Sequence, residues 1–283
     1  MGQKRVAAIH DISCFGKCSL TVALPIISAA GIETATVPTA VLSTHTAAQF
    51  KNFTFRDLTE DLLPIARHWN SLGLHFDAIY TGYLGSLEQI DIIMQFIDLI
   101  KSDDTLVVVD PVMADNGKLY PAFGSEFPKG MAKLCGKADL IIPNMTEAAF
   151  LMDEPYTEGP YTQEYCDAFA RRLCQKTGAK SCLLTGVYFD EKQLGAACFD
   201  GSKTEFVMND RIDRMYHGTG DVFGSGLVSG LVAGQSLKDA TRTAVDFTCK
   251  SIARTIKENP EREYGVNFEG ELAGLMQSLN IIK

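Results

Sequence analysis

The sequence predicts an α/β fold in which a mostly parallel central sheet carries helices on both faces. Segments typical of strands alternate with segments typical of helices along the chain, which is the pattern of parallel sheets. The run Leu106–Val109 is apolar at every position, as strands covered on both faces are. Polar residues cluster where such runs end, and ligands bind at that edge of α/β sheets. We therefore expect a single three-layer α/β/α domain over residues 1–283.

The first half of the chain contains strands and helices in alternation. Apolar residues at helical spacing predict the helix Leu87–Ile100 most clearly. Ser19 is a candidate N-cap for a helix that runs to Ala30. The other segments follow the same rules. We expect strands at Val6–Ile9, Thr34–Pro38, Phe76–Tyr80 and Leu106–Val109, a further helix at Asp57–Trp69, and loops at His10–Cys18, Thr39–Phe50 and Ala114–Phe123.

The second half continues the alternation and adds an antiparallel edge. Two short runs, Gly195–Phe199 and Thr204–Met208, predict a hairpin at the edge of the sheet. Buried strands are expected before it and long helices after it. The strands are Leu140–Ile142 and Ser181–Leu184, and the helices are Thr162–Lys176, Val222–Ala233, Leu237–Lys257 and Glu269–Leu279.

Composition limits the classes of function. Apolar residues make up 46% and charged residues 22% of the 283 residues, as in ordinary soluble proteins. The net charge of −9 argues against a nucleic-acid partner, which needs a basic face. No apolar run is long enough to span a bilayer, and Met1–Val6 lacks the apolar core of a signal peptide. The eight cysteines form no C-x-x-C pair. We therefore expect a cytoplasmic protein with free thiols and no membrane partner.

One glycine-rich stretch, Gly218-Thr219-Gly220-Asp221, predicts an anion site at the start of a helix. Unpaired N–H groups at a helix start favour a phosphate. A carboxylate beside a phosphate is repelled by it, so Asp221 needs an explanation. The residue either accepts a proton from a hydroxyl that attacks the phosphate, or it stabilises the first turn of its helix. The pattern alone leaves both explanations open.

Polar residues follow most of the expected strands, and three of them are acids on the same rim as the glycine turn. Carboxylates are tolerated near phosphates when Mg²⁺ lies between them. The rim therefore indicates a nucleotide, a metal ion and phosphoryl transfer. The three acids meant here are Asp110, Glu147 and Asp221. The segments that follow strands also include a further acid, Asp11, together with Ser43–Thr46, Gly82–Tyr83, Asn144 and Thr185–Gly186.

Four motifs in this order carry a resemblance to a known family. They are Thr81-Gly82-Tyr83-Leu84-Gly85-Ser86, Asp110-Pro111-Val112-Met113, Asn144-x-x-Glu147 and Gly218-Thr219-Gly220-Asp221. With them, nearly the whole chain resembles the ribokinase-like superfamily. The first two motifs and Ser43-Thr44-His45-Thr46 are similar to those of the vitamin B6 kinases, the pyridoxal/pyridoxamine kinases.

The resemblance implies ATP-dependent phosphorylation of the 5′-hydroxymethyl group of a B6 vitamer, which feeds pyridoxal 5′-phosphate salvage. It also implies Mg²⁺, a K⁺ ion that assists, and a homodimer. Asp221 would be the catalytic base, with Gly218, Thr219 and Gly220 as the anion hole. ATP would contact Asp110, Asp115, Asn144, Glu147, Thr185 and Gly186, with Asp110 and Glu147 at the metal, and the vitamer would contact Asp11, Ser13, His45, Thr46 and Tyr83.

Three alternatives stay open. Related pyridoxal kinases often have serine in place of Asp11, whereas hydroxymethylpyrimidine kinases of thiamin synthesis carry an acid near a serine and a glycine, as Asp11, Ser13 and Gly16 do here. A slow vitamer-binding protein is a second alternative, although a binder has no use for a base. A nicotinamide oxidoreductase is a third, but the loop after the first strand has only Gly16 instead of a Gly-x-Gly-x-x-Gly turn.

Overall fold

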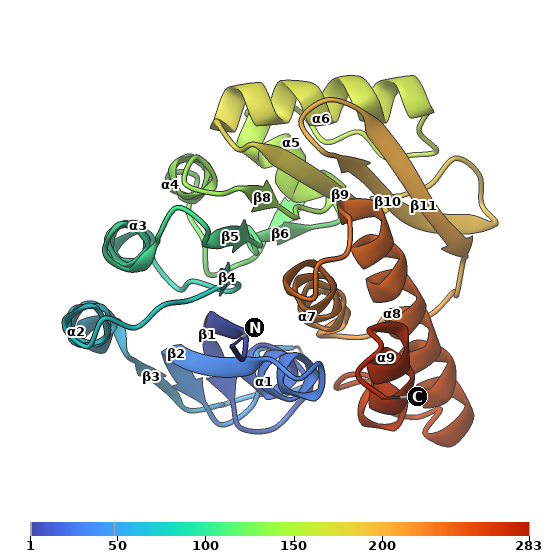
Figure 1. Ribbon diagram of the computed structural model, residues 1–283. Helices are drawn as coiled ribbons and strands as arrows, with labels where there is room; N and C mark the ends of the chain where they lie inside the picture. Colours follow the sequence, from blue (N-terminus) through green and yellow to red (C-terminus); the bar gives the residue numbers. More distant parts are fainter. Residues whose placement is uncertain (1, 48, 283) are drawn as a thin grey trace. The chain divides into compact units, whose positions relative to one another are not determined.

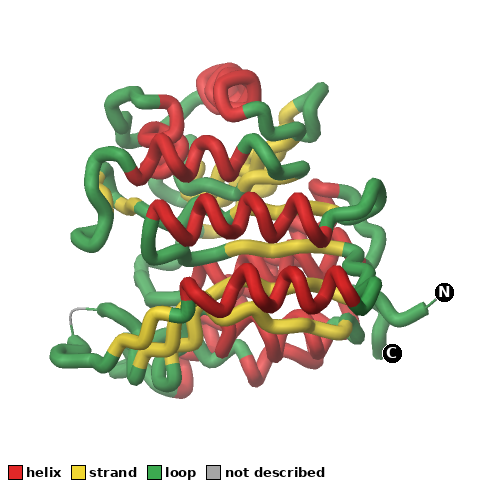
Figure 2. Tube along the Cα trace, turned by 90° about the vertical axis from the view of Figure 1, so that its left-hand side faces the viewer, coloured by secondary structure: helices red, strands yellow, loops and turns green. Residues whose placement is uncertain are grey.

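The computed structural model describes residues 2–47 and 49–282 (Figure 1). The chain forms two compact units, which we describe separately. The first comprises Met1–Leu58, Phe76–Ala78 and Ile212–Lys283, and the second comprises Thr59–His75 and Ile79–Arg211. In both units the helices lie along the direction of the strands that they cover (Figure 2). No helix in the described ranges is long and apolar enough to cross a bilayer.

The first unit is built on the parallel pair β1 (Arg5–Ser13) and β2 (Glu33–Leu42), with β3 (Phe55–Asp57) antiparallel at the outer edge of β2. Four successive apolar residues of β1, Val6–Ile9, are fully buried. Helix α1 packs on β1, β2 and α7, and α7 packs on α8. The helices are α1 (Leu20–Ala29), α7 (Thr219–Val232), α8 (Leu237–Glu258), the 3₁₀ turn η1 (Glu269–Glu271) and α9 (Leu272–Ser278).

The second unit has the strand order β11-β10-β9-β8-β5-β4. Its strands β5, β8 and β9 are parallel, and β10 and β11 continue the sheet as an antiparallel hairpin. The strands are β4 (Ala78–Thr81), β5 (Leu106–Val109), β8 (Leu140–Ile141), β9 (Ser181–Val187), β10 (Gln193–Phe199) and β11 (Thr204–Asp210). The helices are α2 (Thr59–Ser71), α3 (Leu87–Ile100), α4 (Phe127–Cys135), α5 (Met145–Met152) and α6 (Gln163–Thr177), and a separate ribbon pairs β6 (Ala114–Asp115) with β7 (Lys118–Leu119).

The predicted α/β class is confirmed, and the bounds of α3 and β5 are those expected from the sequence. Two polar segments that we expected after strands lie inside them instead. β1 continues through Asp11 to Ser13, because its backbone stays paired with β2 as far as Leu42. β9 likewise includes Thr185 and Gly186, because its pairing with β10 extends to Val187.

Helix α5 and strands β3, β6 and β7 were not predicted. The start of α5 has a clear signal in retrospect, because Asn144 and Glu147 form a capping box. Each of their side chains accepts the backbone N–H of the other residue, at 2.8 and 2.9 Å. The two-residue strands β6 and β7 are too short to show a periodicity. The expected loop Thr39–Phe50 begins later than predicted, because the residues up to Leu42 belong to β2. Residue 48 of this segment lies outside the described residues.

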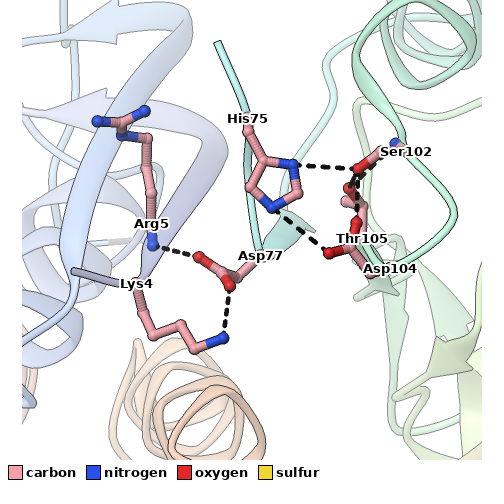
Figure 3. Close-up of polar contacts among 7 residues, drawn as sticks. All are labelled: Lys4, Arg5, His75, Asp77, Ser102, Asp104 and Thr105. Atoms are coloured by element: carbon pink, nitrogen blue, oxygen red, sulfur yellow. Dashed lines mark hydrogen bonds and ion pairs between the residues drawn. The ribbon is translucent and has the colours of Figure 1, made fainter. Parts of the chain in front are cut away.

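Two aspartates fasten the starts of neighbouring strands in the same way, one in each unit. In the first unit, Asp77 donates its N–H to the carbonyl of Arg5 and accepts the N–H of Arg5 on its carboxylate, at 2.8 Å each. Lys4 Nζ also donates to this carboxylate, at 2.7 Å (Figure 3). The figure also shows His75 beside Ser102 and Asp104, which form a polar group in the second unit.

In the second unit, Asp139 repeats this arrangement at the start of β8. Its N–H donates to the carbonyl of Val107 at 2.9 Å, and its carboxylate accepts the N–H of Val107 at 2.8 Å. The carboxylate also pairs with Lys101 at 3.0 Å and with Lys180 at 2.6 Å. Burial alone would raise the pKa of Asp139, but the bonds from Lys180, Val107 and Lys101 outweigh it and hold the pKa below its ordinary value.

The first prediction concerns Asp139→Asn. The substitution removes the charge that three donors share, so we expect a loss of about 1–3 kcal/mol in the free energy of unfolding at pH 7. Because the folded pKa lies below the unfolded value, this difference is full above about pH 4 and shrinks as the pH falls through the folded pKa. Urea unfolding at several pH values measures it.

Asp98→Asn is the matched control. Asp98 forms a salt bridge with Lys137 but is 59% exposed, so we expect a loss below about 1 kcal/mol. Equal losses for the two variants would contradict the fastening role of Asp139.

Candidate active site

The N-terminus of α7 carries the predicted glycine turn in the first unit. Gly218 is the N-cap of α7, with φ 76° and ψ 4°. A Cβ at this position would overlap the carbonyl oxygen of Lys17, so the close approach of the two backbones requires glycine. Thr219 Oγ1 donates to the carbonyl of Tyr216 at 3.1 Å, and Gly220 is exposed. The predicted helix start is thus confirmed, while its role as an anion hole stays a prediction.

Asp221 lies in the first turn of α7, but its side chain does not cap the helix. The cap is Gly218, three residues earlier. The side chain of Asp221 is instead 15% exposed, and its carboxylate lies 4.0 Å from Nδ1 of His10. Burial raises the pKa of Asp221 to about 7, and the charge of Asp11 adds to the rise while the backbone of Ser19 opposes it. A carboxyl group that titrates near neutral pH suits a general base.

Asp11 lies close to Asp221, on β1. It is 4% exposed, and it is flanked by two serines whose hydroxyl groups donate to it. Ser19 Oγ donates to Oδ1 at 2.6 Å and Ser13 Oγ to Oδ2 at 3.1 Å. The pairing register between β1 and β2 shifts between His10 and Ile12, so Asp11 sits at an irregularity of the ladder. Burial raises the pKa of Asp11, and the two hydroxyl bonds oppose the rise.

Two neutral groups complete the surroundings of these acids. His10 is fully buried, and its Nδ1 lies 4.0 Å from Oδ1 of Asp221. Burial lowers the pKa of His10 to about 3, so the imidazole stays neutral and does not form an ion pair with the base. Burial and then the charges of Asp221 and Asp11 raise the pKa of the Cys18 thiol to about 12. Of these neighbours, Asp11 is the one whose negative charge raises the pKa of Asp221.

His45 and Thr46 belong to a loop that packs on other parts of the first unit. His45 Nδ1 accepts the N–H of Ala47 at 3.2 Å, and its Nε2 lies 3.2 Å from the carbonyl oxygen of Tyr264. The ring centroids of His45 and His217 are 5.2 Å apart. Burial lowers the pKa of His45. These contacts hold the His45 ring in place, whereas Thr46 is exposed.

The second unit brings the predicted nucleotide residues together around the start of α5. Asn144 Nδ2 donates to the carbonyl of Ala114 at 2.9 Å, and the N–H of Met113 donates to Glu147 Oε1 at 3.1 Å. Both carboxylate oxygens of Glu147 therefore accept a backbone N–H, since Oε2 accepts that of Asn144. Burial raises the pKa of Glu147 despite these bonds. The capping box and the β6 segment thus fix Asn144 and Glu147 rigidly.

Asp110, Asp115, Thr185 and Gly186 lie around the same helix start. The charge of Asp115 acts on Glu147, and those of Asp110 and Glu147 both act on the buried Cys135 thiol. Thr185 donates its N–H to the carbonyl of Pro143 at 3.0 Å, which places β9 beside Asn144. Gly186 follows with φ 75°. The structure therefore gathers all six residues that we assigned to the nucleotide.

Tyr83 follows β4, and its ring lies beside that of Phe123. Its ring centroid lies 5.7 Å from that of Phe123. Phe123 lines a cavity of about 380 Å³ between the start of α3 and the segment that leads into α4. The cavity is lined by Gly85, Ser86, Leu87 and residues 122–127. The predicted contact of Tyr83 with a substrate stays a prediction.

Asp110 and Glu147 fit a magnesium ion that is held mainly by phosphate and water. Within the described ranges, no group of three or more His, Cys, Asp or Glu side chains could hold a metal ion alone. Mg²⁺ needs only one or two carboxylates when substrate phosphates and waters supply the other oxygens. Both oxygens of Glu147 already accept N–H groups, so this residue suits contact through a water. Asp110 is the second carboxylate that the motif assigns to the ion, and its side chain is largely buried.

Sequence reasoning missed the roles of Ser19 and Thr146. We expected Ser19 to cap α1 with its side chain, but the hydroxyl donates to Asp11 and makes no cap bond. Ser19 also has φ 55° and ψ −136°, a conformation that costs a residue other than glycine about 1–3 kcal/mol. Thr146 Oγ1 accepts the N–H of Gly117 and so holds the β6–β7 ribbon on α5. Neither contact has a signal in the sequence.

Comparisons with known proteins identify the family of this chain. The model of the phosphomethylpyrimidine kinase family matches residues 24–265. The chain belongs to this family. A phosphomethylpyrimidine kinase candidate from Bacteroides thetaiotaomicron, solved in an orthorhombic form with pyridoxal, is 39% identical with a TM-score of 0.90. The match covers 97% of this chain and 96% of that one.

Two further similarities are to B6 kinases. The pyridoxal kinase structure from Lactobacillus plantarum is 30% identical with a TM-score of 0.89, and the match covers 98% of each chain. The pyridoxine kinase of Bacillus subtilis is 28% identical over 194 residues, which are 66% of this chain and 68% of the relative. These similarities confirm the predicted ribokinase-like fold and the resemblance to B6 kinases for this member of the phosphomethylpyrimidine kinase family.

The second prediction concerns Gly218→Ala. The new Cβ meets the Lys17 carbonyl and the residue keeps a positive φ, so we expect a loss of at least about 1–3 kcal/mol in the free energy of unfolding. Gly220→Ala is the control in the same turn. A Cβ at Gly220 has nothing within 4 Å, and alanine favours helices, so we expect a change within about 0.5 kcal/mol. Urea unfolding measures both, and equal losses would refute the close-approach argument.

Proposed function

We propose that this protein transfers the γ-phosphoryl group of ATP to the 5′-hydroxymethyl oxygen of a B6 vitamer. The observation that carries the proposal is Asp221, a carboxyl group with a pKa of about 7 beside an exposed glycine turn at a helix start. Family membership and the pyridoxal-bound relative support the substrate class. The product enters pyridoxal 5′-phosphate salvage.

In the proposed step, Asp221 accepts the proton of the hydroxymethyl group as its oxygen attacks. A bond forms between this oxygen and the γ-phosphorus, and the bond from the γ-phosphorus to the bridging oxygen of ADP breaks. The N–H groups of the turn Gly218–Gly220 receive the charge on the transferring group. His10 contributes by staying neutral, because a cation beside Asp221 would lower its pKa and weaken it as a base.

On the nucleotide side, the residues around the start of α5 bind and orient ATP. Asp110 and Glu147 would hold Mg²⁺, which offsets the negative charge of the phosphate oxygens when it is bound. Asn144 is fixed by its bonds to Ala114 and Glu147, so it enters the reaction already oriented. Thr185 and Gly186 lie beside it on β9 and complete this group of nucleotide residues.

A second candidate is phosphorylation of hydroxymethylpyrimidine or its phosphate. The description of the matching family favours it, and so does Asp11, whose carboxylate can accept a hydrogen bond from an exocyclic amine. The pyridoxal-bound relative and the B6 kinase relatives outweigh it. The two substrates share a hydroxymethyl group, so the same base serves both reactions.

The third prediction tests the function directly. Purified protein with ATP and Mg²⁺, in K⁺ or Na⁺ buffer, is assayed for ADP release on pyridoxal, pyridoxamine, pyridoxine and hydroxymethylpyrimidine. We expect turnover on the B6 vitamers and higher rates in K⁺, an ion that we propose assists the reaction. Asp221→Asn should lower kcat by at least about 10²-fold, the range of general-base catalysis, while ATP still binds.

Asp103→Asn, in an exposed turn, is the control and should keep the wild-type rate. Turnover on hydroxymethylpyrimidine alone would select the second candidate. Vitamer binding without turnover would indicate a binding protein. Sedimentation of the same preparation tests the homodimer that we also propose.

The fourth prediction is the pH dependence of kcat/KM. Asp221 must be deprotonated to act as a base, so the rate should rise with pH through a limb near pH 7 and fall about tenfold for each unit below it. A limb near pH 4 would correspond to the ordinary pKa of an aspartate. It would contradict the conclusion that burial raises the pKa of Asp221. Initial rates between pH 5 and pH 9, in buffers of constant ionic strength, measure the limb.

A further inference from the structure

The residues that we assigned to ATP include acids but no cation. We call them the nucleotide group, and they are Asp110, Asp115, Asn144, Glu147, Thr185 and Gly186. The phosphate chain of ATP is negative, so carboxylates repel it unless positive charge lies nearby. A bound Mg²⁺ ion offsets part of this repulsion, and protein phosphate sites ordinarily add a lysine or an arginine. The nucleotide group by itself therefore lacks a charge that its ligand requires.

Lys118 lies beside one of these acids. It is the only lysine, arginine or histidine in residues 110–128, and residues 138–170 contain none. In the ribbon of β6 and β7, Lys118 is directly opposite Asp115. Opposed residues of an antiparallel pair place their side chains on the same face. The other face carries Ala114, which is fully buried, so Asp115 and Lys118 share the face of the ribbon that is turned away from the core.

The ribbon is fixed on the start of α5, where the nucleotide group gathers. Asn144 Nδ2 donates to the carbonyl of Ala114 at 2.9 Å, and the N–H of Gly117 donates to Thr146 Oγ1 at 3.0 Å. The two residues of the turn that joins β6 to β7 have φ values of 49° and 75°, both positive as in a tight type I′ turn. Lys118 follows this turn directly, so its backbone is held beside the first turn of α5.

The ammonium group of Lys118 has no counter-ion. Asp115 directs its carboxylate to Asn116, whose N–H donates to Oδ1 at 2.8 Å and whose Nδ2 donates to Oδ2 at 3.1 Å. No residue in the described ranges forms an ion pair with Lys118, which is exposed. Asp139, by contrast, pairs with two lysines. A lysine on a fixed ribbon, beside an acid that is bonded elsewhere, is available to an anionic ligand.

We propose that Lys118 binds the phosphate chain of the nucleotide. The inference rests on the function proposed above, in which the nucleotide group binds ATP. The ammonium group donates to phosphate oxygens and supplies the positive charge that the group lacks. The ligand is therefore a nucleoside di- or triphosphate, because a nucleoside alone offers no charge to the lysine. The contact exists before the transfer, so it affects the binding of ATP more than kcat.

The test measures nucleotide binding without a vitamer. Adenosine, ADP and ATP are titrated into the protein with Mg²⁺, at low ionic strength, in a calorimeter. Lys118→Met removes the charge and keeps an unbranched side chain. We expect it to bind ADP and ATP at least about tenfold more weakly, as the loss of one charged hydrogen bond predicts, and to bind adenosine as the wild type does. Lys118→Arg keeps the charge and should stay within about threefold of the wild type.

Lys133→Met is the matched control. Lys133 is exposed in the last turn of α4, which leads to the start of β8, whereas the nucleotide group follows the end of β8. This variant should keep all three affinities. Lys118→Met should unfold at the wild-type temperature without nucleotide, because the lysine is exposed and unpaired, but ADP should raise its Tm less. In the kinase assay, its KM for ATP should rise while kcat stays within about threefold.

The outcomes separate this inference from the proposed function. Equal ADP and ATP affinities for the wild type and Lys118→Met would overturn the inference even if the wild type is an active kinase. An equal loss of adenosine affinity would also overturn it, because the lysine would then act on the fold of the site and not on phosphate. Binding of ADP and ATP through Lys118, in a protein that phosphorylates no vitamer, would support the inference and reject the proposed transfer. A wild type that binds neither nucleotide would reject both.

Discussion

The structure of the site depends on the cost of removing carboxylates from water. A buried carboxylate is tolerated only when donors replace the lost hydration, and the number of donors decides its pKa. Asp139 has two lysines and a backbone N–H, so its pKa stays below the ordinary value and it fastens strands. Burial and the charge of Asp11 raise the pKa of Asp221, and the backbone of Ser19 lowers it too little to compensate. The pKa of Asp221 therefore rises to about 7. The same residue type therefore stays ionised where donors are plentiful and titrates near neutral pH where they are few, which is the property that the proposed base requires.

The sequence predicts well those features that depend on neighbouring residues. The apolar run of β5 and the helical periodicity of α3 give their bounds to the residue. The glycine turn before Asp221 and the Asn144-x-x-Glu147 pattern each locate one group of predicted site residues, because each is a helix start whose chemistry lies within four residues. The capping box shows the limit of this method. The pattern that we interpreted as a nucleotide motif is also the signal that starts α5, and a residue can serve both purposes.

The sequence does not predict features that need partners from distant segments. β1 extends through Asp11 because β2 continues beside it, and the polar residues at its end give no sign of this pairing. The irregular register beside Asp11 depends on the same neighbour. Ser19 shows the problem most clearly, because a serine before a helix indicates an N-cap in any sequence. Its hydroxyl donates instead to Asp11, eight residues earlier, and its backbone influences the pKa of Asp221 on α7. A local pattern carries no information about either.

The loop of residues 17–19 explains why a strained serine and an obligatory glycine lie opposite each other. The carbonyl of Lys17 fills the space where Gly218 has no Cβ, while the N–H of Ser19 reaches Asp221 three residues further along α7. The backbone of this loop thus meets the first turn of the helix at two points. A larger residue at 218 would push the loop away and remove the N–H from the carboxylate. Glycine at 19 would fit the backbone better, but it would remove the hydroxyl that donates to Asp11 Oδ1 and leave Ser13 as the remaining hydroxyl donor. The serine therefore trades some stability for a donor to a buried acid, as strained residues at functional sites do.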